Sequence, residues 1–231
     1  MRLSEPLPSY EVVANVSEGR DVAILSAFTA IVAGSPGVQL LDVHHDPDHD
    51  RSVYTYVGEA EALALATRAL ARLAIATIDL TAATKSGVGR GVHPRIGAID
   101  VIPLIPLGPG GSEHGAVVAA RALGRTIAAD LDLPVHFYGA VARSEVRRAL
   151  PEIRRGGFEA LTERQRDPNH EPDEGPITPH PTGGAVAVGV RSLIAAWNIE
   201  LAGAPKGKLA DAAQAMARSM RGSAPRGVTG L

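Results

Sequence analysis

Apolar and polar residues follow two different periods along the first hundred positions of the chain. Residues 22–32 repeat apolar side chains at helical spacing after Asp21, which we expect to cap a helix. Residues 59–78, after Gly58, form an alanine-rich run that predicts a second helix, of about 30 Å. Short runs rich in β-branched residues predict four strands, at residues 10–16, 38–43, 52–57 and 99–104. The order β-α-β-β-α-β predicts an α+β protein with the split βαβ arrangement of a ferredoxin-like unit, a mixed sheet and outer helices.

The pattern after residue 106 is less regular. Residues 162–184 are polar and rich in Pro, Asp and Gly, so we expect a loop there. Elsewhere we expect a helix at 112–131, a strand at 135–138, a short basic helix near 143–150, a strand at 193–201 and a helix at 209–220. The last two elements predict the beginning of a second unit that is cut short. We therefore divide the chain into residues 1–185 and an incomplete second subdomain, residues 186–231.

Length, charge and residue composition restrict the classes of protein to which the chain can belong. The chain has 231 residues, of which 45% are hydrophobic, enough for a normal core in one or two domains. Its formal net charge of −2 gives no electrostatic basis for binding nucleic acid or an acidic membrane surface. It contains no cysteine, and no apolar run approaches the length of a transmembrane helix. We expect a soluble, cytoplasmic protein whose partners are small molecules.

The segment GVHPRIG, residues 91–97, offers the first candidate chemistry. Pro94 biases His93 toward an extended conformation, and Arg95 carries a guanidinium that can bind a carboxylate through two hydrogen bonds. An imidazole fixed beside an anion site suits acid–base chemistry on a carboxylate-bearing substrate. From these residues alone, a loop histidine beside a solvated arginine is an equal alternative.

A loop rich in histidine and aspartate, HHDPDHDR, spans residues 44–51. Imidazole and carboxylate groups are metal ligands, but these are crowded rather than spaced at helix or hairpin periods. We therefore favour a solvated or anion-binding loop and expect no metal. Arg51, where the loop enters a strand, is the better candidate for holding a substrate carboxylate.

Two other segments combine small polar residues with turns. Asn15, at the end of the first predicted strand, lines a ligand cleft or simply satisfies the turn. Residues 174–184, EGPITPHPTGG, have a backbone preset by Pro and Gly that lets a flat ligand approach closely, or that links two units. His136 lies in a predicted strand, and we expect it in the core or in a cleft wall.

Several of these segments resemble one family. They are, in order, ANVSEGRD, LLDVHHDPDHDRSVYTYVG, GVHPRIGAIDVIPLIPL, LPVHFYGAVARSEVRRALPEIRRGGFEAL and GPITPHPTGGAVAVGVRSLIAAWNIEL. Together they resemble the N-terminal subdomain of glutamate formimidoyltransferase. The resemblance implies two ferredoxin-like subdomains with folate in the groove between them. It also implies transfer of a formimino group from N-formimino-L-glutamate to tetrahydrofolate, the co-substrate, in histidine degradation.

The resemblance also implies roles for individual residues. His93 corresponds to the catalytic histidine, expected to act as general acid and base. From the chemistry of their side chains rather than from the resemblance, we expect Arg51 and Arg95 to hold glutamate carboxylates, with Asp46 near the amidinium and Asn15 as a further substrate contact. The expected folate contacts are Gly175, Pro176, Thr178, His180, Pro181, Thr182, Gly183 and Gly184.

The chain departs from the family pattern at several positions. Val92 stands where the family commonly has Glu, next to the catalytic histidine, and Ala140 replaces a frequent Glu. Two alternatives to the transferase therefore stay open. One is a folate-binding module without catalysis, completed by another chain or as a homodimer. The other is an enzyme that handles 5-formyltetrahydrofolate.

Overall fold

The structure is a computed structural model that describes residues 9–82, 94–194 and 208–223. The chain divides into two compact units, Met1–Leu193 and Ile194–Leu231. In the second unit the predicted helix is present as α7 (Leu209–Ser223). The strand predicted at 193–201 lies largely outside the described residues, and Leu193 and Ile194 are not in a strand.

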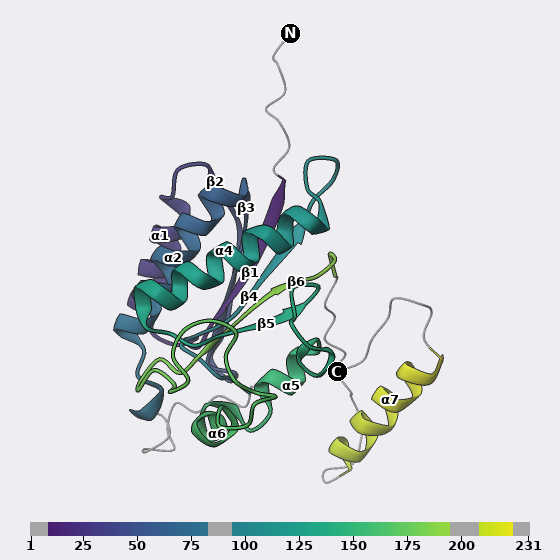
Figure 1. Ribbon diagram of the computed structural model, residues 1–231. Coiled ribbons are helices and arrows are strands. Elements are labelled where there is room, and N and C mark those ends of the chain that lie inside the picture. The colour runs from purple at the N-terminus through teal and green to yellow at the C-terminus, as the bar shows by residue number, and fades with distance from the viewer. Residues whose placement is uncertain (1–8, 83–93, 195–207, 224–231) are drawn as a thin grey trace. The chain divides into compact units, whose positions relative to one another are not determined.

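The first unit contains a mixed six-stranded sheet (Figure 1). β1, β3 and β2 pair antiparallel, as do β1 and β4, whereas β4, β6 and β5 run parallel. The spatial order is β2-β3-β1-β4-β6-β5. The strands are β1 (Tyr10–Val16), β2 (Val38–Asp46), β3 (Arg51–Gly58), β4 (Ile99–Pro106), β5 (Val135–Gly139) and β6 (Val186–Val190).

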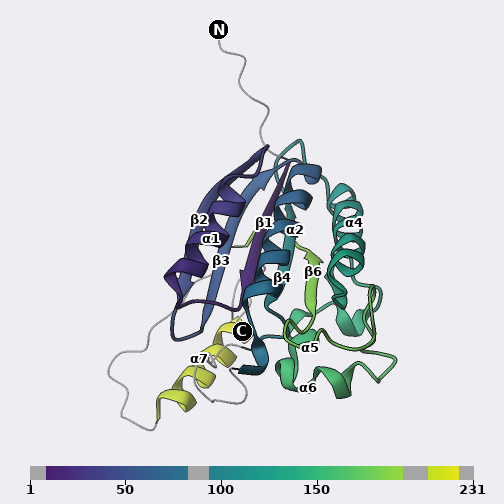
Figure 2. The same ribbon diagram turned by 90° about the vertical axis from the view of Figure 1, so that its left-hand side faces the viewer.

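Three helices cover one face of this sheet, α1 (Val22–Ala33), α2 (Ala60–Thr77) and α4 (Glu113–Leu131). They stand in a row across the strands (Figure 2). The carboxylate of Asp21 accepts the N–H groups of Ala23 and Ile24, which caps α1 as predicted. Alternate strand residues such as Tyr54 and Tyr56 are fully buried beneath these helices and form most of the core.

The other face is covered over only part of its width. The short helices η1 (Glu145–Arg147), α5 (Leu150–Arg154) and α6 (Gly157–Arg164) pack at β4, β5 and β6. Ile153 and Leu161 contact a second small cluster that includes Val101, Tyr138 and Ala187. Over β1, β2 and β3 this face carries no helix of the first unit within the residues described for it, and alternate side chains of β1 and β3 there are half-buried.

Three predictions after residue 139 differ from the structure. The basic helix predicted at 143–150 is wrong in extent, because α5 begins only at Leu150, with Pro151 in its first turn, a position that suits proline. The loop predicted from residue 162 begins only after α6 ends at Arg164. The strand β6 was not predicted, although it inserts between β4 and β5. This strand belongs to the compact unit that continues to Leu193.

Candidate functional site

Four strands bring the predicted site residues to one end of the sheet. β1 ends where β3 and β4 begin, since Val16 pairs with Ser52 on one side and with Ile99 on the other. β6 runs parallel to β4, so it begins at the same end. Asn15 and Arg51 therefore lie near the segment that follows His93. His93 itself lies outside the described residues, which resume at Pro94.

A β-bulge at this end directs an acidic side chain toward the partly covered face. Asn15 pairs with Val101 and Val16 pairs with Ile99, so Asp100 is an extra residue in β4. Ile99 joins the core under the three long helices, whereas Val101 packs in the second cluster with α5 and α6. Asp100 pairs with Arg154 of α5, on the same side as Val101.

Asp100 connects two segments that are distant in sequence. Its side chain is 2% exposed, and a carboxylate so buried is costly unless it has partners. One oxygen, Oδ1, accepts the N–H of Ile96 at 2.8 Å. The other, Oδ2, forms an ion pair with the Arg154 guanidinium. One residue therefore joins the segment after His93 to helix α5.

Arg51 lies close enough to this ion pair to interact with it electrostatically. It alternates with the buried Ser52, so its side chain lies on the partly covered face, as does that of Asn15. Burial lowers the pKa of Arg51, and the nearby charge of Arg154 lowers it further, against the opposing effect of Asp100. We call Arg51, Asp100 and Arg154 the Asp100 cluster. The Asn15 amide Nδ2 donates to the carbonyl of Val13 at 3.0 Å, within its own strand.

The backbone after His93 is held on several sides. The carbonyl of Arg95 accepts the N–H of Phe158 at 2.7 Å, which ties it to α6. The Ser17 hydroxyl donates to the carbonyl of Gly97 at 2.7 Å. Ala98 donates its N–H to the carbonyl of Gly183 at 2.9 Å. Because these contacts come from separate elements, the position of residues 95–98 is fixed by the whole fold.

The last residues of the predicted folate loop pack against this segment, whereas the first do not. Gly184 has a φ of +71°, and a Cβ there would collide with the carbonyl oxygen of Ile96. Glycine at this position therefore allows two backbones to meet. His180 Nδ1 accepts the N–H of Gly183 at 2.9 Å, so its ring stabilises a tight turn. Gly175 lies instead beside Leu133, before β5. Of the remaining predicted contacts Thr178 and Pro181 are exposed, whereas Pro176 and Thr182 are half-buried.

Asp46, the last residue of β2, stabilises the loop between β2 and β3 through hydrogen bonds. It accepts the N–H groups of Asp48 at 2.9 Å and His49 at 3.0 Å, and His49 Nδ1 lies 2.5 Å from its second oxygen. The hydrogen bond from the His49 backbone is the largest of several that lower the pKa of Asp46. Its oxygens are thus engaged within the loop, which leaves less of the carboxylate for the expected amidinium. Within residues 9–82, 94–194 and 208–223, no group of three His, Cys, Asp or Glu side chains is arranged to hold a metal ion.

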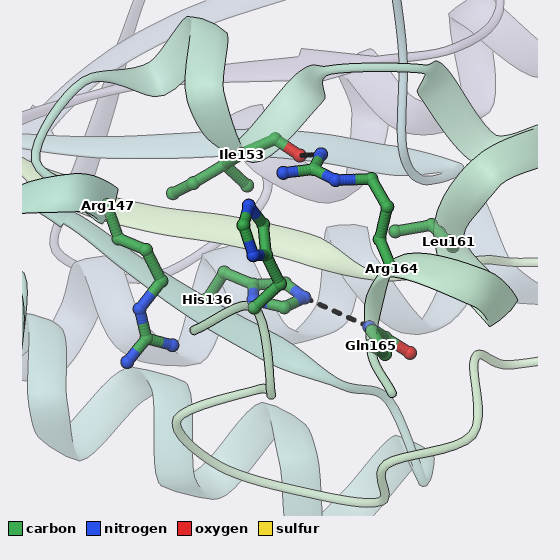
Figure 3. Close-up of a pocket in the computed structure, with 7 residues that line it drawn as sticks. His136, Arg147, Ile153, Leu161, Arg164 and Gln165 are labelled. Atoms are coloured by element: carbon green, nitrogen blue, oxygen red, sulfur yellow. Dashed lines mark hydrogen bonds between the residues drawn. The ribbon is translucent and has the colours of Figure 1, made fainter. Parts of the chain in front are cut away.

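A small pocket lies under α5 and α6, and His136 is one of the residues that line it (Figure 3). Its volume of about 10 Å³ is room for one water molecule, so it is too small for a substrate. His136 Nε2 lies 3.0 Å from the side-chain nitrogen of Gln165, which donates to it when the ring is neutral. Burial lowers the pKa of His136 to about 3, helped by the charges of Arg147, Arg164 and His170. The expectation of a core or cleft-wall histidine is confirmed, since the residue is 5% exposed.

Comparison with known proteins identifies the family. The model of the formiminotransferase domain, N-terminal subdomain, matches residues 9–191. The chain belongs to this formiminotransferase family. The resemblance seen in its motifs is therefore confirmed.

Relatives of the chain carry the same family name. It is 38% identical over 191 residues to mouse formimidoyltransferase-cyclodeaminase, covering 83% of this chain and 34% of that protein. It is 34% identical to glutamate formimidoyltransferase of Streptococcus pyogenes serotype M1, covering 83% of this chain and 62% of the relative. The enzyme of the same name from Thermoplasma acidophilum is 36% identical, with 83% and 61% covered. The chain thus spans between about a third and two thirds of the length of these relatives. None of its described helices is long and apolar enough to cross a membrane.

Two residues of the candidate site were not identified from the sequence. Asp100 is an acid inside the apolar run IDVIPLIP, and a buried carboxylate requires a cation or several donors nearby. The need for such a partner could have identified Asp100 as a site residue from the sequence. Arg154 lies in a run with several other arginines, so nothing in the sequence distinguishes it as the partner.

Proposed function

We propose that this protein transfers a formimino group from N-formimino-L-glutamate to tetrahydrofolate. The observation that carries the proposal is the family match over residues 9–191. This range includes the GVHPRIG segment and all three residues of the Asp100 cluster. The arginine side chains of that cluster, next to the segment after His93, suit a substrate with two carboxylates. Relatives named glutamate formimidoyltransferase support the same reaction.

The proposed chemistry is a nitrogen-to-nitrogen transfer. A ring nitrogen of tetrahydrofolate attacks the formimino carbon, and a new C–N bond gives a tetrahedral intermediate. His93 takes the proton from the attacking nitrogen and gives it to the departing glutamate nitrogen as the old C–N bond breaks. Imidazole suits both steps because its ordinary pKa of about 6.5 makes both protonation states accessible near neutral pH.

The other assignments follow from the same proposal. Arg51 and Arg95 hold glutamate carboxylates, and Asn15 faces the substrate from β1. The loop from Gly175 to Gly184 contacts folate, with its last residues fixed against residues 96–98. The strands β1 to β4, in the order β2-β3-β1-β4, make up the ferredoxin-like unit of the N-terminal subdomain.

A matched pair of histidine variants tests the catalytic assignment. Formation of formimino-tetrahydrofolate and free glutamate is measured for the wild type, His93→Ala and His114→Ala. His114 is exposed in the first turn of α4, so its loss leaves turnover unchanged. General acid–base groups contribute about 10²- to 10⁴-fold, so His93→Ala lowers kcat by at least about 10²-fold. Turnover within about threefold of wild type would refute the role of His93. Tetrahydrofolate binding without any transfer by the wild type would refute the transferase and favour a folate-binding module.

A further inference from the structure

We infer that a network of charged side chains at the outer edge of β5 positions the loop 175–184 and so sets the affinity for tetrahydrofolate. The network consists of Asp173, Glu174, Arg143 and Arg147, and we call it the Asp173 network. Asp173 is the positioning residue at its centre. The inference rests on the proposed function for the assignment of this loop to folate, and it adds the residues that determine where the loop begins.

The network lies where a neighbouring strand would otherwise pair with β5. β6 pairs with one side of β5, and on the other side Val135 and Glu174 form a short antiparallel bridge. The N–H of Val135 donates to the carbonyl of Glu174 at 2.9 Å, and the carbonyl of Val135 accepts the N–H of Asp173 at 2.8 Å. The Asp173 carboxylate accepts the N–H of Phe137 at 2.7 Å. Because strand edges otherwise leave such groups unpaired, Asp173 completes this edge with both its backbone and its side chain.

Two arginine side chains hold the buried carboxylate of Asp173. Its side chain is 0% exposed, so its charge requires cationic partners. Arg147 provides both terminal nitrogens, with Nη1 3.2 Å from Oδ2 and Nη2 3.2 Å from Oδ1. Nη1 of Arg147 also donates to the carbonyl of Glu171 at 2.6 Å. The backbone that leads into the loop is therefore fixed on both sides of residue 172.

Arg143 connects the two acids of the network to β5. Its Nε lies 3.5 Å from Oδ1 of Asp173, and its Nη2 lies 2.5 Å from Oε1 of Glu174. The central carbon of its guanidinium lies 5.6 Å from the centre of the Phe137 ring. A planar cation that contacts two adjacent acids and an aromatic ring fixes their relative orientation better than the point charge of a lysine. Arg143 therefore sets the direction in which the chain leaves residues 173–174.

The loop turns away from the sheet edge directly after the network. Gly175 has a φ of +85°, and a Cβ there would lie 2.7 Å from the carbonyl oxygen of Leu133. The far end of the loop is fixed separately, by the hydrogen bond from Ala98 to Gly183. Between these ends, residues 176–179 make no backbone hydrogen bond within the part of the chain that the structure describes. The position of this middle part is therefore determined by the two ends, and the Asp173 network fixes the first of them.

A loop that is already held in place favours binding. A ligand that contacts it does not have to order it, so loss of the network lowers affinity without changing the chemical step. The expected folate contacts nearest the network are Gly175, Pro176 and Thr178. The effect should therefore fall on tetrahydrofolate and not on the formimino donor.

The variants that test the inference are Arg143→Gln, Arg143→Lys and, as a control, Arg148→Gln. Arg148 is exposed and pairs with Glu145 outside the network, so its variant also removes one positive charge. We expect Arg143→Gln to weaken calorimetric binding of tetrahydrofolate to the full chain by about fivefold or more, with part of the affinity recovered in Arg143→Lys. The KM for tetrahydrofolate rises in parallel, whereas kcat and the KM for N-formimino-L-glutamate stay within about twofold. Arg148→Gln changes none of these values by more than about twofold.

Hydrogen exchange of the free protein separates positioning from a purely structural role. Arg143→Gln speeds exchange in residues 176–182 and leaves β4 unchanged. Asp173→Asn keeps an oxygen for the N–H of Phe137 but loses its charge, so it acts in the same direction, and the double variant binds about as weakly as the weaker single variant. Faster exchange with unchanged tetrahydrofolate affinity would overturn the inference, and so would a wild type that does not bind tetrahydrofolate. If the wild type binds tetrahydrofolate but transfers no formimino group, the proposed function fails while the network is still judged by the affinities.

Discussion

Two buried polar sites lie beneath the same helices, α5 and α6, and the protein stabilises them in opposite ways. On β4, Asp100 is given a cationic partner and a backbone donor. On β5, His136 is surrounded by Arg147, Arg164 and His170, and its pKa falls to about 3. In the first site a carboxylate is paired with a cation, whereas in the second the histidine ring is kept neutral.

The difference indicates which site can interact with a ligand. The Asp100 cluster lies at an end of the sheet where strands, a bulge and α5 meet, and Nε of Arg154 has no acceptor among the described residues. The His136 pocket is water-sized, and the ring has a neutral partner in Gln165. The first site is therefore the candidate for ligand binding, whereas the second packs the short helices onto the sheet.

The largest effect is expected from removing the acid of the first site. Asp100→Ala leaves Arg154 buried without its counter-ion and Ile96 without an acceptor, so the free energy of unfolding falls by about 3–5 kcal/mol. Urea unfolding at pH 7 measures the change. The control is Arg148→Ala, which breaks an exposed pair with Glu145 and costs about 0–1 kcal/mol. Equal losses in the two variants would remove the contrast between buried and surface charge.

The free energy of unfolding should depend on pH through His136 of the second site. The folded pKa of His136, about 3, lies below the ordinary value of about 6.5, so the unfolded state binds more protons between these values. Stability is therefore present above pH 6.5 and lost as the pH falls, by about 2 kcal/mol from pH 7 to pH 5. His136→Phe removes this part of the pH dependence. Urea midpoints at the two pH values test it, and parallel curves for wild type and variant would contradict the prediction.

The smallest effect concerns the partner of His136. Gln165→Leu leaves Nε2 of the ring without its donor, which lowers the free energy of unfolding at pH 7 by about 1–2 kcal/mol. The double variant His136→Phe/Gln165→Leu removes both polar groups, so it is more stable than the sum of the two single variants predicts. Additive losses in thermal or urea unfolding would show that the hydrogen bond is not what links the two residues.

The strands and helices before residue 139 could be predicted because each follows a simple period. Residues 10–16 and 52–57 alternate between core and partly covered face, and Asp21 and Ser112 both cap helices where helical spacing begins. These signals are local, so the sequence alone carries them.

The missed features depend on long-range packing. The run AVAVGV after Gly184 is short enough to be overlooked, and its insertion between β4 and β5 is a property of the whole sheet. The bulge at Asp100 is a mismatch between two strands, which neither strand reveals by itself. Arg51 and Arg95 could be chosen by chemistry, whereas Arg154 needed the position of α5.

β6 lies between β4 and β5 in the sheet but comes after both in the sequence, and this affects folding during translation. Among the described strands β5 pairs only with β6, which is the last of them in the sequence. During synthesis, β1 to β4 can pair early, but β5 has no partner strand among the described ones until residues 186–190 have left the ribosome. Helix α4 packs on both of these strands and must wait with its apolar face only partly covered. The nascent protein therefore carries a half-finished sheet through much of its translation, and this interval is when it most needs protection from aggregation.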